Sequence, residues 1–109
     1  MASPLSKQIE DLMSEKLLFR KIGLNINDVA AELCSNRVYV SRAVNSDFGM
    51  TFREYINSKR IEYAEKLLKE CPKMSLEDIA LDAGFISEQM FVRKFMEIKK
   101  FSPSIYVRE

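Results

Sequence analysis

Two groups of side chains in this sequence, one around Arg42 and one around Arg93, are suited to hydrogen bonding with the edges of nucleotide bases. A guanidinium group can donate two parallel hydrogen bonds to guanine, and a side-chain amide can pair in a similar bidentate way with adenine. A carboxylate can accept from cytosine, and a small aliphatic side chain can contact the methyl group of thymine. The base-contacting residues predicted on this basis are Arg37, Val38, Ser41, Arg42, Asn45, Glu88, Gln89, Val92 and Arg93.

Residue types that commonly carry catalysis or bind metals are scarce. The 109 residues include no histidine, and Cys34 and Cys71 stand alone, without the spacing of a metal site or a disulfide framework. The three glycines do not form a phosphate-binding loop. The sequence therefore predicts no enzyme activity, no metal site and no cofactor. We expect both cysteines to be buried or half-buried apolar residues.

Charge is close to balanced over the whole chain but uneven along it. The net charge is +1, whereas residues 34–60 carry five basic and two acidic side chains, and residues 83–109 carry five and three. Chance variation would explain this pattern equally well on its own, but local basic segments can contact phosphates without a high overall charge. The residues expected to contact the DNA backbone are Asn36, Thr51, Ser87, Lys94, Lys99 and Lys100.

Apolar residues recur at three- and four-residue spacing through most of the chain, and no β-type alternation is sustained. This pattern predicts an all-α fold of about seven helices. Thr51 with Glu54 and Ser75 with Asp78 have the form of capping boxes. The expected helical segments are 5–17, 26–33, 36–46, 51–70, 75–83 and 87–98, with a last short turn from Pro103.

The sequence also contains an internal repeat. Residues 28–30 (Asp-Val-Ala) match residues 78–80 (Asp-Ile-Ala), and after a one-residue slip residues 40–42 (Val-Ser-Arg) match residues 91–93 (Phe-Val-Arg). Two copies are too few for a solenoid, so the repeat predicts two similar helical units joined by a long helix. The predicted boundaries are 1–50 for the first unit, 51–70 for the linker helix and 71–109 for the second unit.

Each unit has the sequence form of a helix-turn-helix. A small residue, Ala30 or Ala80, lies where two helices would cross closely, and four residues later Cys34 or Gly84 occupies the tight turn. The recognition helices that follow are expected over about 36–46 and 87–98, with the polar groups described above on their outer faces. Their predicted inner positions are Val40, Val44, Phe91, Phe95 and Ile98.

The expected linker helix of about 20 residues would span roughly 30 Å at 1.5 Å per residue. Successive major-groove segments on one side of B-DNA lie about 34 Å apart. We therefore predict sequence-specific binding of double-stranded DNA by one chain through two recognition helices. The alternative is a helical module that binds another protein with the same surfaces.

The pattern resembles the DNA-binding domain of the AraC/XylS family. The residues that carry the resemblance are Asp28-Val29-Ala30, Tyr39-Val40-Ser41-Arg42 and Phe52-x-x-Tyr55-Ile56 in the first half, and Ile79-Ala80-x-x-x-Gly84-Phe85, Phe91-x-Arg93-x-Phe95 and Ser102-Pro103-x-x-Tyr106 in the second. The family's base-contacting positions fall among the residues named above. Three features depart from the family pattern. Lys100 replaces a usual glycine, Val107 displaces to Arg108 the arginine that commonly follows the final tyrosine, and Glu88 places a carboxylate on the expected groove-facing surface.

The resemblance implies a transcription regulator with two helix-turn-helix units, usually an activator that recruits RNA polymerase. It also implies that the intact protein carries a sensory or dimerisation domain, and we expect this chain to be the C-terminal part of such a regulator. No segment has the features of a signal peptide or the length of a membrane span, so we expect a cytoplasmic protein with no membrane partner.

Overall fold

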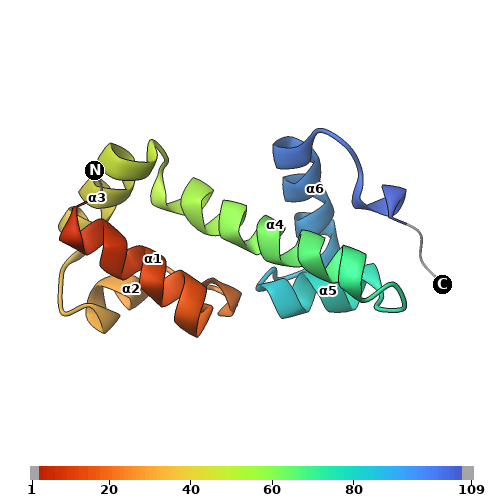
Figure 1. Cartoon of the computed structure of the whole chain (residues 1–109), viewed down its shortest axis with the longest axis horizontal. Helices are drawn as coiled ribbons and strands as arrows, with labels where there is room; N and C mark the ends of the chain where they lie inside the picture. The colour runs from red at the N-terminus through yellow and green to blue at the C-terminus, as the bar shows by residue number, and fades with distance from the viewer. Residues whose placement is uncertain (1–2, 107–109) are drawn as a thin grey trace.

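The computed structural model describes residues 3–106 as six α-helices and two short 3₁₀ helices, with no strand in that range (Figure 1). The α-helices are α1 (Pro4–Lys16), α2 (Ile26–Glu32), α3 (Arg37–Phe48), α4 (Phe52–Glu70), α5 (Leu76–Ala83) and α6 (Glu88–Lys99). The 3₁₀ helices are η1 (Leu18–Arg20) and η2 (Pro103–Ile105). The all-α prediction is confirmed, and the expected last short turn is η2.

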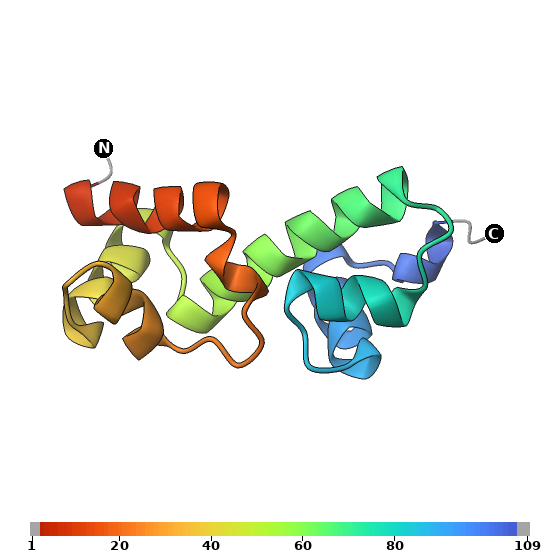
Figure 2. The same cartoon turned by 90° about the horizontal axis from the view of Figure 1, so that it is seen from below.

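The molecule is elongated, with extents of 44 × 23 × 21 Å. Figure 2 shows two lobes, one formed around α1, α2 and α3 and the other around α5 and α6, with α4 running through both. The first turns of α4 bury Tyr55 and Ile56 in the first lobe, and its later turns bury Ile61 and Ala64 in the second. Within residues 3–106, no helix is long and apolar enough to cross a membrane.

Most helix ends follow the local signals of the sequence, but at α5 only half of the predicted capping box forms, with Ser75 Oγ accepting from the Asp78 amide at 3.1 Å. The capping box at α4 is complete, because Thr51 Oγ1 accepts from the Glu54 amide at 3.1 Å and Glu54 Oε1 accepts from the Thr51 amide at 2.8 Å. α3 continues to Phe48, two residues past its expected end, because the chain first reaches the left-handed region at Gly49 (φ 66°). The short helix η1 was not anticipated.

The core of the second lobe shows one wrong expectation. Phe91 and Phe95 have no exposed surface, as predicted, but Ile98 is 42% exposed. After α6 the chain turns back through Lys100, whose φ is 70°. The Phe101 ring that follows lies edge to face with the Phe95 ring, with 5.5 Å between the ring centres, so Phe95 gains an aromatic contact beyond the end of α6.

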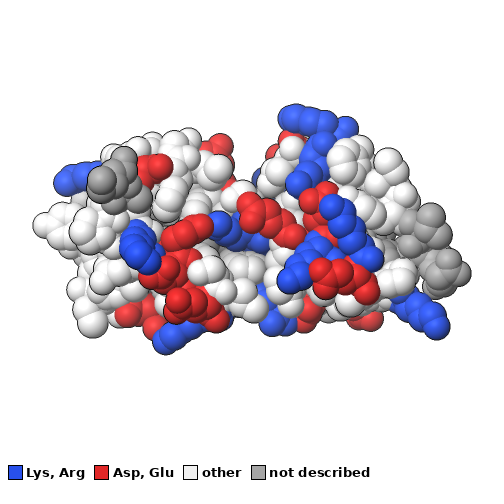
Figure 3. All heavy atoms as spheres, viewed as in Figure 1, with Lys and Arg blue, Asp and Glu red and all other residues white. Residues whose placement is uncertain are grey.

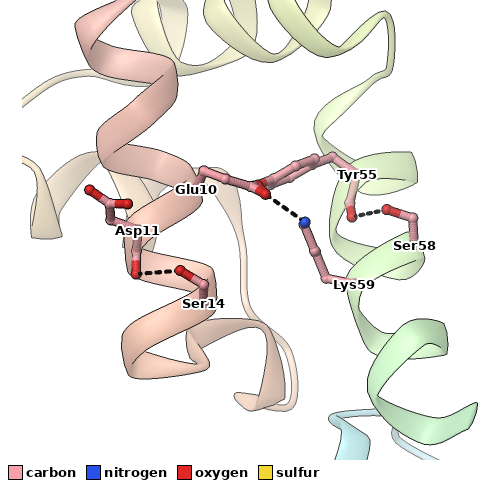
Figure 4. Close-up of polar contacts among 6 residues, drawn as sticks. All are labelled: Glu10, Asp11, Ser14, Tyr55, Ser58 and Lys59. Carbon is pink, nitrogen blue, oxygen red and sulfur yellow. Dashed lines mark hydrogen bonds and ion pairs between the residues drawn. The ribbon is translucent and has the colours of Figure 1, made fainter. Parts of the chain in front are cut away.

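A glutamate accepts hydrogen bonds from a tyrosine and a lysine in each lobe. In the first lobe, Glu10 on α1 accepts from the Tyr55 hydroxyl. It also accepts from Lys59 Nζ at 2.7 Å, the contact drawn as a dashed line in Figure 4. In the second, Glu65 on α4 accepts from the Tyr106 hydroxyl at 2.7 Å and lies 2.9 Å from the ammonium group of Lys99. Tyr55 and Tyr106 are 51 residues apart, the same offset by which residues 40–42 match residues 91–93, whereas the two glutamates and the two lysines do not correspond at that offset.

Candidate nucleic-acid interface

The outer face of α3 gathers the five base-contacting residues predicted for the first unit. Asn36 caps the helix, since its side-chain oxygen accepts from the Tyr39 amide at 3.0 Å. Val40 and Val44 are fully buried against the first core, which orients the helix. The opposite face is exposed and forms a shallow groove beside Ile26. The predicted residues that line this groove are Arg37, Val38, Ser41, Arg42 and Asn45.

The outer face of α6 is arranged similarly but is less open. Ser87 caps the helix by accepting from the Met90 amide at 3.2 Å. Glu88, Gln89 and Arg93 are exposed. Val92, predicted among them, is only half exposed because it packs against the second core. The second recognition helix therefore offers three freely exposed polar side chains near its N-terminal half.

The turns that precede the two recognition helices have the same backbone geometry. The Ser35 amide donates to the Ala30 carbonyl at 2.8 Å in the first unit, and the Phe85 amide donates to the Ala80 carbonyl at 2.9 Å in the second. The residue at the corner is left-handed in both, with φ 52° at Cys34 and 105° at Gly84. In both turns an amide donates to the carbonyl five residues earlier, and the residue before that amide is left-handed. This combination is the Schellman motif, which ends a helix.

The corner position explains why the expectation of a buried Cys34 was wrong. Its side chain is exposed at the bend between α2 and α3, whereas Cys71 is half-buried. A buried alanine occupies the helix crossing in each unit, with Ala30 at 4% and Ala80 at 0% exposure. Close packing of the two helices therefore depends on the alanine, whereas the corner residue supplies the left-handed backbone conformation of the turn.

The six residues predicted to contact the DNA backbone differ in their surroundings. Asn36, Thr51 and Ser87 are N-caps, so their side-chain oxygens already accept a backbone amide. Lys100 is exposed at the C-terminal end of α6. The two other lysines form ion pairs, Lys94 with Glu97 at 3.4 Å and Lys99 with Glu65 at 2.9 Å.

Between the lobes lies a groove that brings the predicted backbone residue Lys94 together with α4 residues that were not among the predicted site residues. Arg53, Asn57 and Arg60 line it from α4, and Lys94 lines it from α6. Arg53 is exposed, whereas the guanidinium of Arg60 is turned toward backbone carbonyls of the first lobe. The local excess of basic residues in 34–60 was the available signal for Arg53.

The face drawn in Figure 3 is not uniformly basic. Acidic side chains gather over α1, and basic side chains are concentrated around α6 and the end of α4. Acidic groups repel phosphates, so the α1 surface is the less favourable side for nucleic acid. In the described residues no group of three or more cysteine, aspartate or glutamate side chains could hold a metal ion.

Two short helices packed behind two exposed helices, with matched turns and a shared long helix, define a protein with a pair of helix-turn-helix units. A family model described as a helix-turn-helix domain matches residues 29–109. The chain belongs to this family, the AraC-type group of DNA-binding transcription regulators.

Relatives and solved structures agree with this membership. The chain is 36% identical over 83 residues to the melibiose operon regulatory protein of Escherichia coli (strain K12), a match covering 76% of this chain and 27% of that protein. The chain therefore spans less than a third of that relative's length. The C-terminal domain of AraT, a response regulator from Geobacillus stearothermophilus, superposes with a TM-score of 0.84 at 25% identity, covering 95% of this chain and 84% of that one.

A second solved structure shares the fold. The DNA-binding domain of AdpA, a global transcriptional factor crystallised with a target DNA, superposes with a TM-score of 0.79 at 21% identity. The match covers 96% of this chain and 90% of that one. The arrangement of the two helix-turn-helix units is thus one that a DNA-binding domain of known structure adopts.

Proposed function

We propose that this chain binds double-stranded DNA sequence-specifically by placing α3 and α6 in two successive major-groove segments, and that it thereby regulates transcription. The observation that carries the proposal is the pair of matched turns. Each turn leads into a helix with an exposed polar face, and α4 belongs to both units. α4 has 19 residues and so spans roughly 28 Å at 1.5 Å per residue. This length is comparable to the 34 Å or so between major-groove segments on one side of B-DNA.

Base readout is assigned mainly to α3. Arg42 and Arg37 are exposed and can each donate a fork of hydrogen bonds to guanine, while Asn45 can pair with adenine. Val38 is 52% exposed, which leaves its methyl groups free to meet a thymine methyl. On α6 the half-buried Val92 contributes less. The residues left for readout there are Glu88, Gln89 and Arg93.

Backbone contacts are assigned to the helix N-termini and the lysines. Asn36, Thr51 and Ser87 stand at N-termini, where amide groups and the helix dipole favour a phosphate. The lysines assigned to phosphates are Lys94, Lys99 and Lys100. Arg53, which lines the groove between the lobes, joins them because the DNA backbone must pass between the two major-groove segments.

The role of the intact protein is proposed from the family. We infer a transcription activator without enzymatic activity that works in the cytoplasm, where bacterial chromosomal DNA and RNA polymerase are found. RNA polymerase is its expected protein partner, and a sensory or dimerisation domain is expected to control it. The lack of any histidine in the sequence fits a non-enzymatic role, because histidine is the most common general base.

Selection from randomised duplexes by the purified chain, followed by salt titration on the selected sequence, tests the proposal. We expect enrichment of a bipartite site with its two parts about one helical turn apart. The logarithm of the binding constant should fall linearly with the logarithm of salt concentration, by about 0.9 for each phosphate contact. A module that binds only proteins would enrich no sequence and show no salt-dependent affinity for DNA.

A further inference from the structure

The two lobes touch each other away from α4. Figures 1 and 2 both place η1, which belongs to the first lobe, beside the C-terminal end of α5 in the second. Arg20 of η1 donates from Nε to the Asp82 carbonyl oxygen at 2.7 Å, and from Nη2 to the Asp82 carboxylate at 2.5 Å. One side chain thus holds both a backbone and a side-chain oxygen across the lobe boundary.

Other contacts hold this junction in one geometry. The Tyr63 hydroxyl on α4 donates to the second carboxylate oxygen of Asp82 at 3.2 Å. The Arg20 guanidinium lies 5.1 Å from the centre of the Tyr63 ring, within the range of a cation–π contact. Asp82, which belongs to the second lobe, is therefore engaged both by the first lobe and by the helix that joins the lobes.

A second arginine anchors η1 from the side of α4. Arg60 donates to the carbonyl oxygens of Phe19 at 2.8 Å and Lys21 at 3.0 Å. These two carbonyls flank Arg20 in the sequence, so the backbone on both sides of Arg20 is fixed. Burial lowers the pKa of Arg60, but a guanidinium remains protonated at neutral pH.

The corner of the second helix-turn-helix also lies directly against this segment. A Cβ atom added to Gly84 would lie 2.6 Å from the Phe19 carbonyl oxygen and 2.9 Å from the Arg20 Cα. Both are backbone atoms, which cannot move aside cheaply. The turn that orients α6 is therefore in contact with the backbone of the first lobe.

We propose that Arg20 and Asp82 are positioning residues, which fix the relative orientation of α3 and α6 and so set the spacing between the two DNA segments that the chain reads. The proposal rests on the two-segment binding mode proposed above. A single helix of 19 residues can bend and twist along its length. A contact that joins the lobes beside the helix resists both motions, and neither Arg20 nor Asp82 needs to touch DNA.

DNA duplexes that differ in spacing provide the first test. The selected site is compared with the same site carrying one extra base pair between its two parts, which shifts one part by about 3.4 Å and rotates it by about 35°. For the unmodified chain we expect a loss of affinity of about tenfold or more, the size of a one-mismatch penalty. For Arg20→Ala we expect a loss of about threefold or less, and for Asp82→Asn an intermediate loss.

The affinity for the selected site divided by the affinity for the site with the extra base pair separates a positioning effect from an effect of charge. Removing Arg20 lowers the net charge and Asp82→Asn raises it, so a general electrostatic effect would act in opposite directions on binding, whereas both changes should lower the ratio. The control is Lys7→Ala, which removes an exposed cation paired with Asp11 within α1 and should leave the ratio unchanged. Equal ratios in all four proteins would overturn the proposal.

A second measurement uses no DNA and tests the orientation directly. Residual dipolar couplings of backbone amides should fit one alignment tensor for both lobes of the unmodified chain and of Lys7→Ala. In Arg20→Ala the two lobes should need separate tensors. A common tensor in Arg20→Ala would reject the positioning role even if the chain bound no DNA, and a failure to bind DNA with separate tensors would reject only the proposed function.

Discussion

Arg42 lies on the exposed face of α3 with Arg37, Ser41 and Asn45, the face that the proposed binding mode turns toward the base edges. Its helix is held in place by Val40 and Val44, which are fully buried on the opposite side. In the proposed binding mode, readout depends on where the Arg42 side chain begins, so we expect the buried valines to support specificity by fixing the helix.

Arg42→Ala should weaken binding to the selected site by about 1–3 kcal/mol and relax the preference at one base pair. The reason is the loss of a bidentate contact with a single base. Competition binding with selected and random duplexes measures the effect. The matched comparison is Arg53→Ala, which should weaken binding to all sequences alike and reduce the salt slope by about 1. Equal losses for Arg42→Ala on selected and random DNA would assign Arg42 to phosphate instead.

The backbone of Lys100 has a conformation that is unfavourable for a residue with a side chain. Its φ of 70° is left-handed, a region that a residue with a Cβ occupies at a cost of roughly 1–2 kcal/mol. Glycine avoids this cost but loses more chain entropy on folding, so Lys100→Gly should stabilise the chain by about 0.5–1 kcal/mol. Urea unfolding measures the change.

Lys66→Gly is the matched control for that substitution. Lys66 is exposed within α4, four residues before the helix ends at Glu70, where glycine should destabilise by about 1 kcal/mol. A destabilisation by Lys100→Gly as large as that of Lys66→Gly would show that the lysine side chain contributes more than its conformation costs.

At the scale of elements, each recognition helix depends on the short helix behind it. α2 and α5 are short, with 7 and 8 residues, and are stable only because they are capped and packed against the lobes. Ala80 has no exposed surface at the crossing of α5. The space that a larger side chain would need at this crossing is therefore filled by the neighbouring helix.

Ala80→Leu should destabilise the second lobe by about 1–3 kcal/mol or more through overpacking. Thermal unfolding and amide chemical shifts of α5 and α6 measure the effect. Ala31→Leu adds the same side chain to an exposed position of α2 and should change stability by less than about 0.5 kcal/mol. A folded Ala80→Leu chain with an unchanged melting temperature would contradict the close crossing in the second helix-turn-helix.

At the scale of the whole molecule, each lobe contains a glutamate, Glu10 or Glu65, that is hydrogen-bonded to a tyrosine and paired with a lysine. Burial alone would raise the pKa of Glu10, but hydrogen bonds from Lys59 and Tyr55 outweigh it and lower the pKa below its ordinary value. Hydrogen bonds from Lys99 and Tyr106 lower the pKa of Glu65 in the same way. A carboxyl group with a lowered folded-state pKa stabilises the fold above its unfolded pKa, and this contribution is lost as the pH falls through the folded value.

The chain should therefore lose stability as the pH falls below the ordinary glutamate value of 4.5. Urea unfolding at about pH 6 and about pH 3 measures the loss. Glu65→Gln should be less stable at the higher pH and should lose less on acidification, because its side chain does not titrate. Glu15→Gln, at an exposed position of α1, should keep the pH dependence of the unmodified chain. An unchanged acid dependence in Glu65→Gln would mean that the Glu65 contacts do not stabilise the second lobe.

The local features of this protein were readable from the sequence because they depend on residues close together in the chain. Helical periodicity placed Val40, Val44, Phe91 and Phe95 inside, and the capping residue Thr51 located the start of α4. The all-α class and the pair of helix-turn-helix units follow from the same short-range signals. The exposed polar face of α3 is also a consequence of periodicity, since a buried stripe leaves the opposite stripe outside.

Only the tertiary structure decided which distant residues meet. Arg20 and Asp82 are 62 residues apart, and with 17 basic and 16 acidic residues the sequence offers no means of selecting that pair. The exposures of Ile98, Val92 and Cys34 likewise depend on tertiary packing, which the spacing of apolar residues along the chain does not determine. Helix formation is decided within a few residues, whereas the relative orientation of the recognition helices depends on contacts between lobes, which no local pattern encodes.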